Sequence, residues 1–244
     1  MMKVQLLFVV SAILGSALRG AAAATAAAAP AKKEGLSHRA AGEYIQIHGW
    51  LMWVSMGFLF PLGAILIRFN RGLTDSNSLA SPARARLLLY LHSTVQCGGV
   101  GCATAGIAIL IKEFGPTFFH THMKLGLALW IITMIMPVIS IVRPAKGTQA
   151  RPIWLFVHWL MGTGVIVLGI VNCYIGIEIY QFHHGSIRSL DIAFSVQIAV
   201  MALVYFLQDR FSYILGQGSK HAFKSASKVA SRQSMKIEAV LATP

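Results

Sequence analysis

The chain has 244 residues, of which 56% are hydrophobic and only 12% charged. Soluble domains carry about twice that fraction of charge, so the composition excludes an ordinary soluble protein and predicts a polytopic membrane protein. The formal net charge is +13, but the basic residues flank apolar runs and line no polar face, which argues against a nucleic-acid partner. All three cysteines lie inside apolar runs and indicate buried thiols, not a disulfide framework.

Residues 1–29 begin with a lysine, a short apolar stretch and an Ala-rich tract. This order predicts a secretory signal peptide that is cleaved within the Ala-rich tract, and an uncleaved first membrane helix is the alternative. Residues 30–43 would then form a short extracytoplasmic lead.

Five apolar runs follow, each long enough to cross a bilayer as a helix. They cover residues 46–67, 87–111, 122–142, 153–177 and 190–207. The predicted fold is an all-α membrane protein, in which a four-helix transmembrane bundle is joined by one additional C-terminal transmembrane helix. This domain would cover residues 44–210, and residues 211–244 would form a mobile basic tail.

The loops differ in their content of lysine and arginine, which predicts the orientation. The first and third connections and the tail are rich in these residues, whereas the second and fourth connections hold few. The positive-inside rule therefore places the tail in the cytoplasm and the N-terminus outside. Secretion through a signal peptide requires the same orientation, in the plasma membrane or an endomembrane.

Four histidines lie near the N-terminal ends of four successive predicted helices: His48, His92, His122 and His158. Because successive helices run in opposite directions, the first and third histidines fall near the outer face and the other two near the inner face. The inner two follow Arg86 and Arg151 by six and seven residues, which is about 10 Å of helix in both cases. They should therefore match in depth.

Each pair of matched depth comes from alternate helices, which lie diagonally across an up-down bundle. A flat group with two axial positions can bridge such a diagonal, and haem iron takes one imidazole on each side. The pattern predicts two haems stacked across one membrane. Zinc would need its ligands at one level, and a proton relay would need intramembrane carboxylates. Gly126 and Gly162, one turn after two of the histidines, would leave room for a porphyrin, with close helix packing as the alternative.

Four motifs in this order resemble the cytochrome b561 family, especially the plant cytochrome b561 domain-containing proteins. They are HGWLMWVSMGFLFPLGAILIRF, YLHSTVQ, HMKLG and HWLMGTGVIVLGIVN, and the resemblance covers about residues 43–210. It implies transmembrane electron transport through two non-covalent haem b groups. The donor would be cytoplasmic ascorbate, and the outer acceptor would be monodehydroascorbate or a ferric chelate, in the latter case as a ferric reductase. It also implies that the family's axial ligands fall on His48, His92, His122 and His158, whereas His120 does not match.

Some positions depart from the family pattern. Met56 stands where many relatives have tryptophan, and Trp159 where many have a second histidine. The predicted lead is too short for the DOMON domain that precedes the core in larger relatives. These departures leave the four histidines intact and bear on the physiological substrates.

Basic and aromatic side chains near the two levels are further candidates. The inner arginines would bind an anionic reductant or a haem propionate through charge-assisted hydrogen bonds, or would only determine topology: Arg68, Arg84, Arg86 and Arg151. Lys112 and Lys124 have the corresponding outer positions. Trp53, Phe58 and Trp130 would line the gap between the haems or simply pack in the core.

Two other functions stay open at this point. The chain would be a non-redox membrane anchor, or a haem-bearing subunit of a larger quinone-linked complex. The expected partners are the lipid bilayer, a small-molecule donor and an outer acceptor, and a homodimer is compatible with the sequence.

Overall fold

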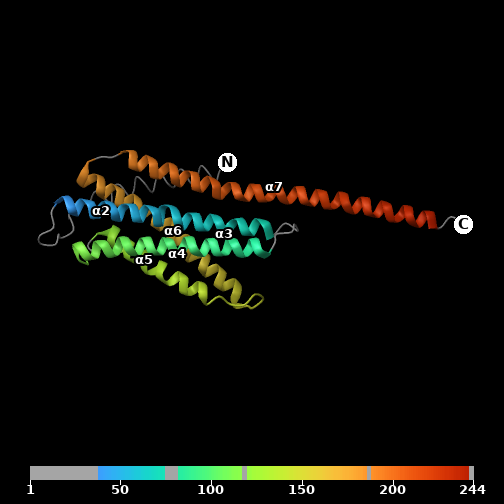
Figure 1. Cartoon of the computed structure of the whole chain (residues 1–244), viewed down its shortest axis with the longest axis horizontal. Coiled ribbons are helices and arrows are strands. Elements are labelled where there is room, and N and C mark those ends of the chain that lie inside the picture. The colour runs from blue at the N-terminus through green and yellow to red at the C-terminus, as the bar shows by residue number, and fades with distance from the viewer. Residues whose placement is uncertain (1–37, 75–81, 117–119, 186–187, 242–244) are drawn as a thin grey trace. The chain divides into compact units, whose positions relative to one another are not determined.

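The computed structural model describes residues 38–74, 82–116, 120–185 and 188–241. The predicted signal peptide and most of the predicted lead lie outside these residues. The described chain is almost entirely helical (Figure 1), in the order α2 (His38–Met52), η1 (Trp53–Leu59), α3 (Phe60–Thr74), α4 (Pro82–Phe114), α5 (Thr121–Ile141), α6 (Ala150–His184) and α7 (Arg188–Leu241).

Five stretches are long and apolar enough to cross a membrane, which confirms the predicted all-α membrane fold. They are Arg39–Phe69, Ala83–Phe114, Thr121–Ile141, Ala150–His184 and Arg188–Gln208. Many of their large apolar side chains are exposed, as a bilayer requires, and Ile141 is exposed by 83%. Helix α7 continues past the last span to Leu241. Residues 211–241 of the predicted tail are therefore helical, and the mobility of the tail stays a prediction.

The chain divides into two compact units. The first contains the described residues up to Gly63 together with Ser93–Ile198, and the second contains Ala64–His92 with the residues from Ala199 onward. The first unit therefore includes α2, η1, α5, α6, most of α4 and the beginning of α7. Its core is a cluster of Met56, Phe60, Ala103, Leu129 and Val165.

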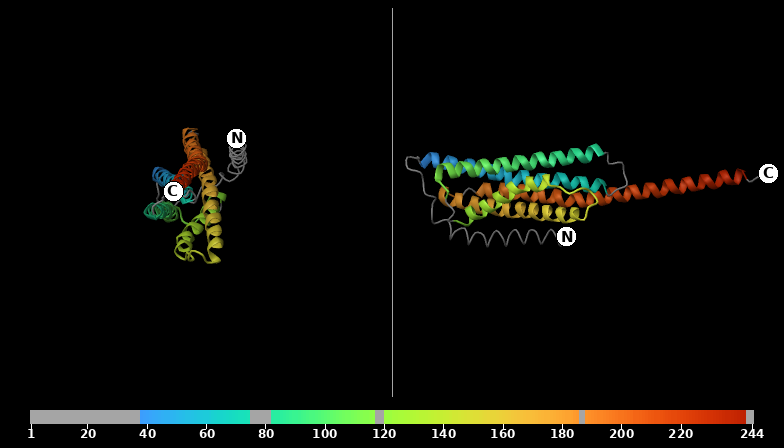
Figure 2. Two further views of the ribbon diagram at one scale, coloured as in Figure 1. Left: turned by 90° about the vertical axis from the view of Figure 1, so that its right-hand side faces the viewer. Right: turned by 90° about the horizontal axis from the view of Figure 1, so that it is seen from below.

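Helices α5 and α6 form an antiparallel hairpin in the first unit. They pack side by side along the chain's third and fourth spans (Figures 1 and 2). At the end near their connection, the Trp154 indole donates a hydrogen bond of 2.8 Å to the Ile139 carbonyl. Helix α5 also contains Pro137, which removes one backbone donor from the helix.

The first span changes from α-helix to π-helix at η1, between His48 and α3. A π-helix closes its turns with one additional residue and leaves backbone groups to be satisfied by other partners. Gln197 of α7 supplies one partner, because its Nε2 donates to the Gly57 carbonyl at 2.9 Å. Its Oε1 accepts the Trp53 indole hydrogen at 2.7 Å. The start of α7 is thus bonded to the π-helical turn.

The fully buried ring of Phe194 leaves room only for a glycine at position 57 of η1. A Cβ atom added at Gly57 would lie 2.6 Å from Phe194 Cε2. We therefore expect Gly57→Ala to overpack this contact and to destabilise the protein by about 1–3 kcal/mol. Thermal inactivation of the purified protein, followed by size-exclusion chromatography, measures the effect.

Gly101→Ala is the matched control for that substitution, because nothing lies within 4 Å of an added Cβ at Gly101. In this variant alanine should be neutral or slightly stabilising, since it has the higher helix propensity. Equal melting of the Gly57 and Gly101 variants would contradict the proposed packing of Phe194.

Candidate functional site

His48 of α2 and His122 of α5 meet inside the first unit. Their ring centroids lie 6.2 Å apart, and the ring planes are nearly perpendicular, at 83°. The two residues are far apart in the sequence and were predicted to share one depth near the outer face. The structure brings this pair together, and their role as iron ligands stays a prediction.

Each of the two rings is fixed by one hydrogen bond to a backbone carbonyl of another helix. His48 Nδ1 lies 3.0 Å from the Gly106 oxygen of α4, and His122 Nδ1 lies 3.1 Å from the Asn172 oxygen of α6. A carbonyl can only accept, so Nδ1 carries the hydrogen and Nε2 is the ring nitrogen with a lone pair for a metal. Histidines that ligate metals are almost always held in this way.

The distance between the rings fits a single iron between them. A metal–imidazole bond of about 2.0–2.1 Å on each side, with the radii of two five-membered rings added, gives a centroid separation of roughly 6 Å. The separation of 6.2 Å agrees with this. No group of three His, Cys, Asp or Glu that could hold a metal ion occurs among the described residues, but a haem iron requires only two protein ligands.

Two glycines on the neighbouring helices allow the rings to approach. A Cβ at Gly176 of α6 would lie 2.9 Å from His122 Cε1. A Cβ at Gly106 would lie 2.6 Å from Met52 Cε, on the same span as His48, and 3.4 Å from His48 Nδ1. From their spacing, Gly126 and Gly162 were expected to leave room for a porphyrin. In the structure, a Cβ at Gly126 would meet the Asn172 amide nitrogen at 3.1 Å and one at Gly162 would meet Met136 at 3.6 Å, so these two glycines face protein side chains.

The predicted inner histidines lie in different units. His158 of α6 stacks on the Trp154 ring, with centroids 5.2 Å apart and planes at 12°. His92 lies on α4, in the second unit, and is half-buried. The pairing of these two histidines stays a prediction.

Arg151 and Arg143 gather at the same indole at the end of the α5–α6 hairpin. The Arg151 guanidinium lies 4.6 Å from the centroid of the Trp154 ring, and that of Arg143 lies 5.7 Å from it. Partial desolvation and the neighbouring Arg151 charge lower the pKa of Arg143. Two cations are thus held close together beside the ring that stacks on His158.

The other three predicted arginines belong to the second unit. Arg68 lies over the Tyr205 ring, with its guanidinium carbon 4.0 Å from the centroid. Arg84 and Arg86 are exposed at the start of α4. Among the four arginines predicted to contact a reductant, Arg151 is the one that belongs to the unit with His158.

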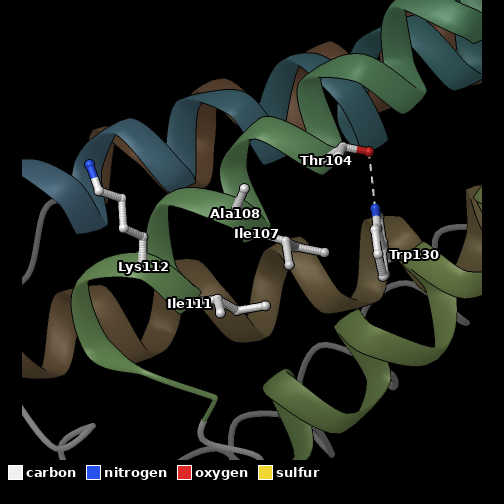
Figure 3. A pocket seen from close by; sticks show the side chains of 6 residues that line it. All are labelled: Thr104, Ile107, Ala108, Ile111, Lys112 and Trp130. Carbon is white, nitrogen blue, oxygen red and sulfur yellow. Dashed lines mark hydrogen bonds between the residues drawn. The ribbon is translucent and has the colours of Figure 1, made fainter.

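An apolar pocket of about 320 Å³ opens between α4 and α5 (Figure 3). At one edge the Trp130 indole donates to the Thr104 hydroxyl at 3.0 Å, and the Lys112 side chain points away from the isoleucines. The pocket residues of α4 lie three or four positions apart and therefore share one side of that helix. Gly106, whose carbonyl bonds to His48, lies on the opposite side. The pocket is lined by Thr104, Ile107, Ala108, Ile111, Lys112 and Trp130, so it contains none of the predicted haem ligands.

The remaining outer and aromatic candidates take ordinary packing or surface positions. Lys112 pairs with Glu113 at 3.6 Å, and Lys124 and Phe58 are exposed. Of the two departures from the family pattern, Met56 is buried in the core, and Trp159 is 48% exposed.

Comparison with known proteins identifies the family. A cytochrome b561 domain-containing protein of Arabidopsis thaliana is 34% identical over 176 residues, which cover 72% of this chain and 66% of that relative. The chain belongs to the cytochrome b561 family. A cytochrome b561 and DOMON domain-containing protein of the same plant is 30% identical over 76% of the chain and 44% of its own length.

A more distant relative of this cytochrome b561 protein carries an enzyme name. It is a Xenopus laevis protein, named as a candidate ferric-chelate reductase, and it is 21% identical over 55% of the chain and 23% of its own length. The chain thus spans just under two thirds of the first relative and less than half of the other two. No family model and no solved structure matches the chain. The family relationship implies that the protein binds haem b.

The close contact at Gly176 gives a test of this site. In Gly176→Ala, the added methyl group must displace the His122 imidazole, because their carbon atoms would otherwise lie 2.9 Å apart. We expect this variant to retain less haem than wild type, as counted by the pyridine haemochrome assay. Gly164→Ala, on the same helix with nothing within 4 Å, should retain the wild-type amount. Equal haem loss in both variants would contradict a site at His122.

Proposed function

We propose that this cytochrome b561 protein carries electrons across its membrane through two haem b groups, each held by two histidines. His48 and His122 would hold one group near the outer face, and His92 and His158 the other near the inner face. The donor would be cytoplasmic ascorbate, and the acceptor would lie outside. The observation that carries the proposal is the close pair of rings of His48 and His122, with centroids 6.2 Å apart and both Nδ1 atoms held by carbonyls.

The haem, when bound, supplies an iron that gains and loses one electron. The protein residues determine which chemistry is open to that iron. With the imidazoles of His48 and His122 holding the iron, no position on it would remain for oxygen or a substrate. The residues that fix His48 and His122 therefore favour electron transfer over catalysis at the metal.

The geometry of α6 supports two haem levels. This helix carries His158 near one end and, fourteen residues later, Asn172, whose carbonyl holds His122. Fourteen residues of α-helix span roughly 21 Å, and the hydrocarbon core of a bilayer is about 30 Å thick. One rigid helix thus gives a fixed separation between the predicted inner ligand and the support of the outer one.

The hairpin arginines support an anionic donor at the inner level. Arg151 and Arg143 lie near one indole, and that indole stacks on His158. Arg151 donates one N–H to the Pro144 carbonyl at 3.3 Å, and a guanidinium that lies against a ring keeps its other N–H groups available for hydrogen bonds. Ascorbate is an anion at neutral pH, and its oxygens would accept these bonds. The bias of lysine and arginine among the loops supports a cytoplasmic position for this end.

The outer acceptor is proposed from the relatives. The name of the Xenopus relative supports a ferric chelate, and the family resemblance includes monodehydroascorbate. A membrane anchor without redox function is the alternative, and it would bind no haem at the four histidines.

The ligand assignment is tested by single substitutions. His48→Ala and His122→Ala should each remove the same one of two haems, because each leaves an iron with one protein ligand. His92→Ala and His158→Ala should each remove the other. The pyridine haemochrome assay counts the haems, and redox titration identifies which of the two is lost. His120→Ala, just before α5, is the control and should keep both. If all four variants kept two haems, the assignment would be wrong.

The donor site is tested with ascorbate on one side of a membrane. In right-side-out vesicles loaded with ascorbate, Arg151→Gln should slow haem reduction at low ascorbate and recover at high ascorbate. Loss of one charge-assisted hydrogen bond should weaken donor binding by about 1.5–3 kcal/mol. Stopped-flow absorbance measures the rate. The same substitution at Arg68, Arg84 and Arg86 shows whether the second unit contributes.

The sidedness has its own control. External ascorbate at the same concentration should reduce the haems slowly in sealed vesicles. Faster reduction from outside would reverse the proposed direction, and unchanged kinetics in all four arginine variants would remove this donor site.

A further inference from the structure

Asn172 is a polar residue in the middle of the apolar helix α6, and the sequence pattern did not predict a role for it. The residue is only 9% exposed, and its Oδ1 accepts no hydrogen bond from the described residues. A buried amide oxygen without a donor is costly in an apolar surrounding. Polar side chains within membrane helices therefore point to a functional role.

The position of Asn172 links it to one proposed haem ligand. Its main-chain oxygen lies 3.1 Å from His122 Nδ1. Its side-chain amide nitrogen lies against Gly126, one turn after His122, where an added Cβ would come within 3.1 Å. Both the backbone and the side chain of Asn172 thus face the turn of α5 that carries His122.

Other buried polar residues of the same unit are satisfied within the protein. The Thr133 hydroxyl donates to the Trp130 carbonyl at 2.8 Å, and the Ser55 hydroxyl donates to the Gly99 carbonyl at 2.7 Å. Their dipoles are largely compensated by these partners. The Asn172 Oδ1 differs because it accepts no hydrogen bond of good geometry from the described residues, although the side chain lies within reach of the His122 ring.

We infer that Asn172 is a positioning residue that lowers the reduction potential of the haem held by His122. This inference rests on the proposed function. The main-chain oxygen fixes the Nδ1–H tautomer of the imidazole, which makes Nε2 a stronger ligand. The partial negative charge of the side-chain oxygen, in a medium of low dielectric constant, favours the more positive oxidised iron over the reduced one. Groups that hydrogen-bond to the iron ligands, and the polarity around the haem, are established means of setting haem potentials.

Asn172→Leu in the full-length, haem-loaded protein is the test, because leucine has a similar size and leaves the main-chain carbonyl in place. We expect two haems, of which one becomes easier to reduce. The expected change in its reduction equilibrium is about threefold to tenfold, and tenfold corresponds to 59 mV for one electron. The low-spin EPR signal of that haem should change as well. Optical redox titration and EPR measure both effects.

Two further variants complete the experiment. Asn172→Asp keeps an acceptor oxygen and adds negative charge at the same place, so it should shift the same haem in the opposite direction. This variant decides the case if Asn172→Leu loses haem or fails to fold. Thr133→Val, an isosteric change of a buried residue on the helix of His122, should leave both potentials unchanged.

The outcomes separate this inference from the proposed function. If His122→Ala loses one haem while neither Asn172 variant shifts a potential, the inference is overturned and the ligand assignment stands. An equal shift of both haems, or the same shift in Thr133→Val, also overturns it. If His122→Ala keeps both haems, the ligand assignment fails, and the inference fails with it.

Discussion

The hydrogen bonds from two imidazoles to helix carbonyls are the interaction on which the outer site depends. A carbonyl within a helix already accepts one backbone hydrogen bond, but it has a second lone pair. His48 and His122 use this remaining capacity at Gly106 and Asn172. The polar ring nitrogen is thereby satisfied without another polar side chain in the membrane, and the second nitrogen is aimed by rigid helices. The ring separation of 6.2 Å follows from where these two carbonyls lie.

This arrangement requires that the helices approach one another closely. It also requires that the first span keeps a fixed rotation about its own axis. Gly176 and Gly106 allow the approach. A Cβ at Gly176 would come within 2.9 Å of the His122 ring, and a Cβ at Gly106 would come within 2.6 Å of Met52 Cε, one turn after His48. The π-helical turn η1 affects the rotation, since its additional residue changes the direction in which α2 and α3 face. Gln197 bonds to η1 at two points. The start of α7 is therefore hydrogen-bonded to the same span that carries His48.

The sequence predicted the five spans, and it predicted that His48 and His122 lie at one depth. Both predictions were possible because residue type and spacing carry them. A long apolar run and a histidine within it are readable from the chain alone. The supports of the rings were not predicted, because every residue has a carbonyl and its use leaves no signal in the sequence. Gly126 was selected over Gly176 for the same reason: spacing shows which glycines share a helix with a histidine, but only the packing shows which glycine faces it across the helix interface. Asn172 and Gln197 stand out in the sequence as polar residues within apolar helices. Only the structure shows the partners that give these two residues a role.

The end of the hairpin that carries His158 is built differently from the pair of His48 and His122. There His158 is held by a flat contact with Trp154, and the indole also accepts the guanidinium groups of Arg143 and Arg151. Two cations beside one ring repel each other, which agrees with the lowered pKa of Arg143. An anion between them would relieve this repulsion and would sit one aromatic ring away from the imidazole. The outer pair thus has the features of a site built to hold a metal group, whereas the hairpin has the features of a site built to receive a charged molecule beside one.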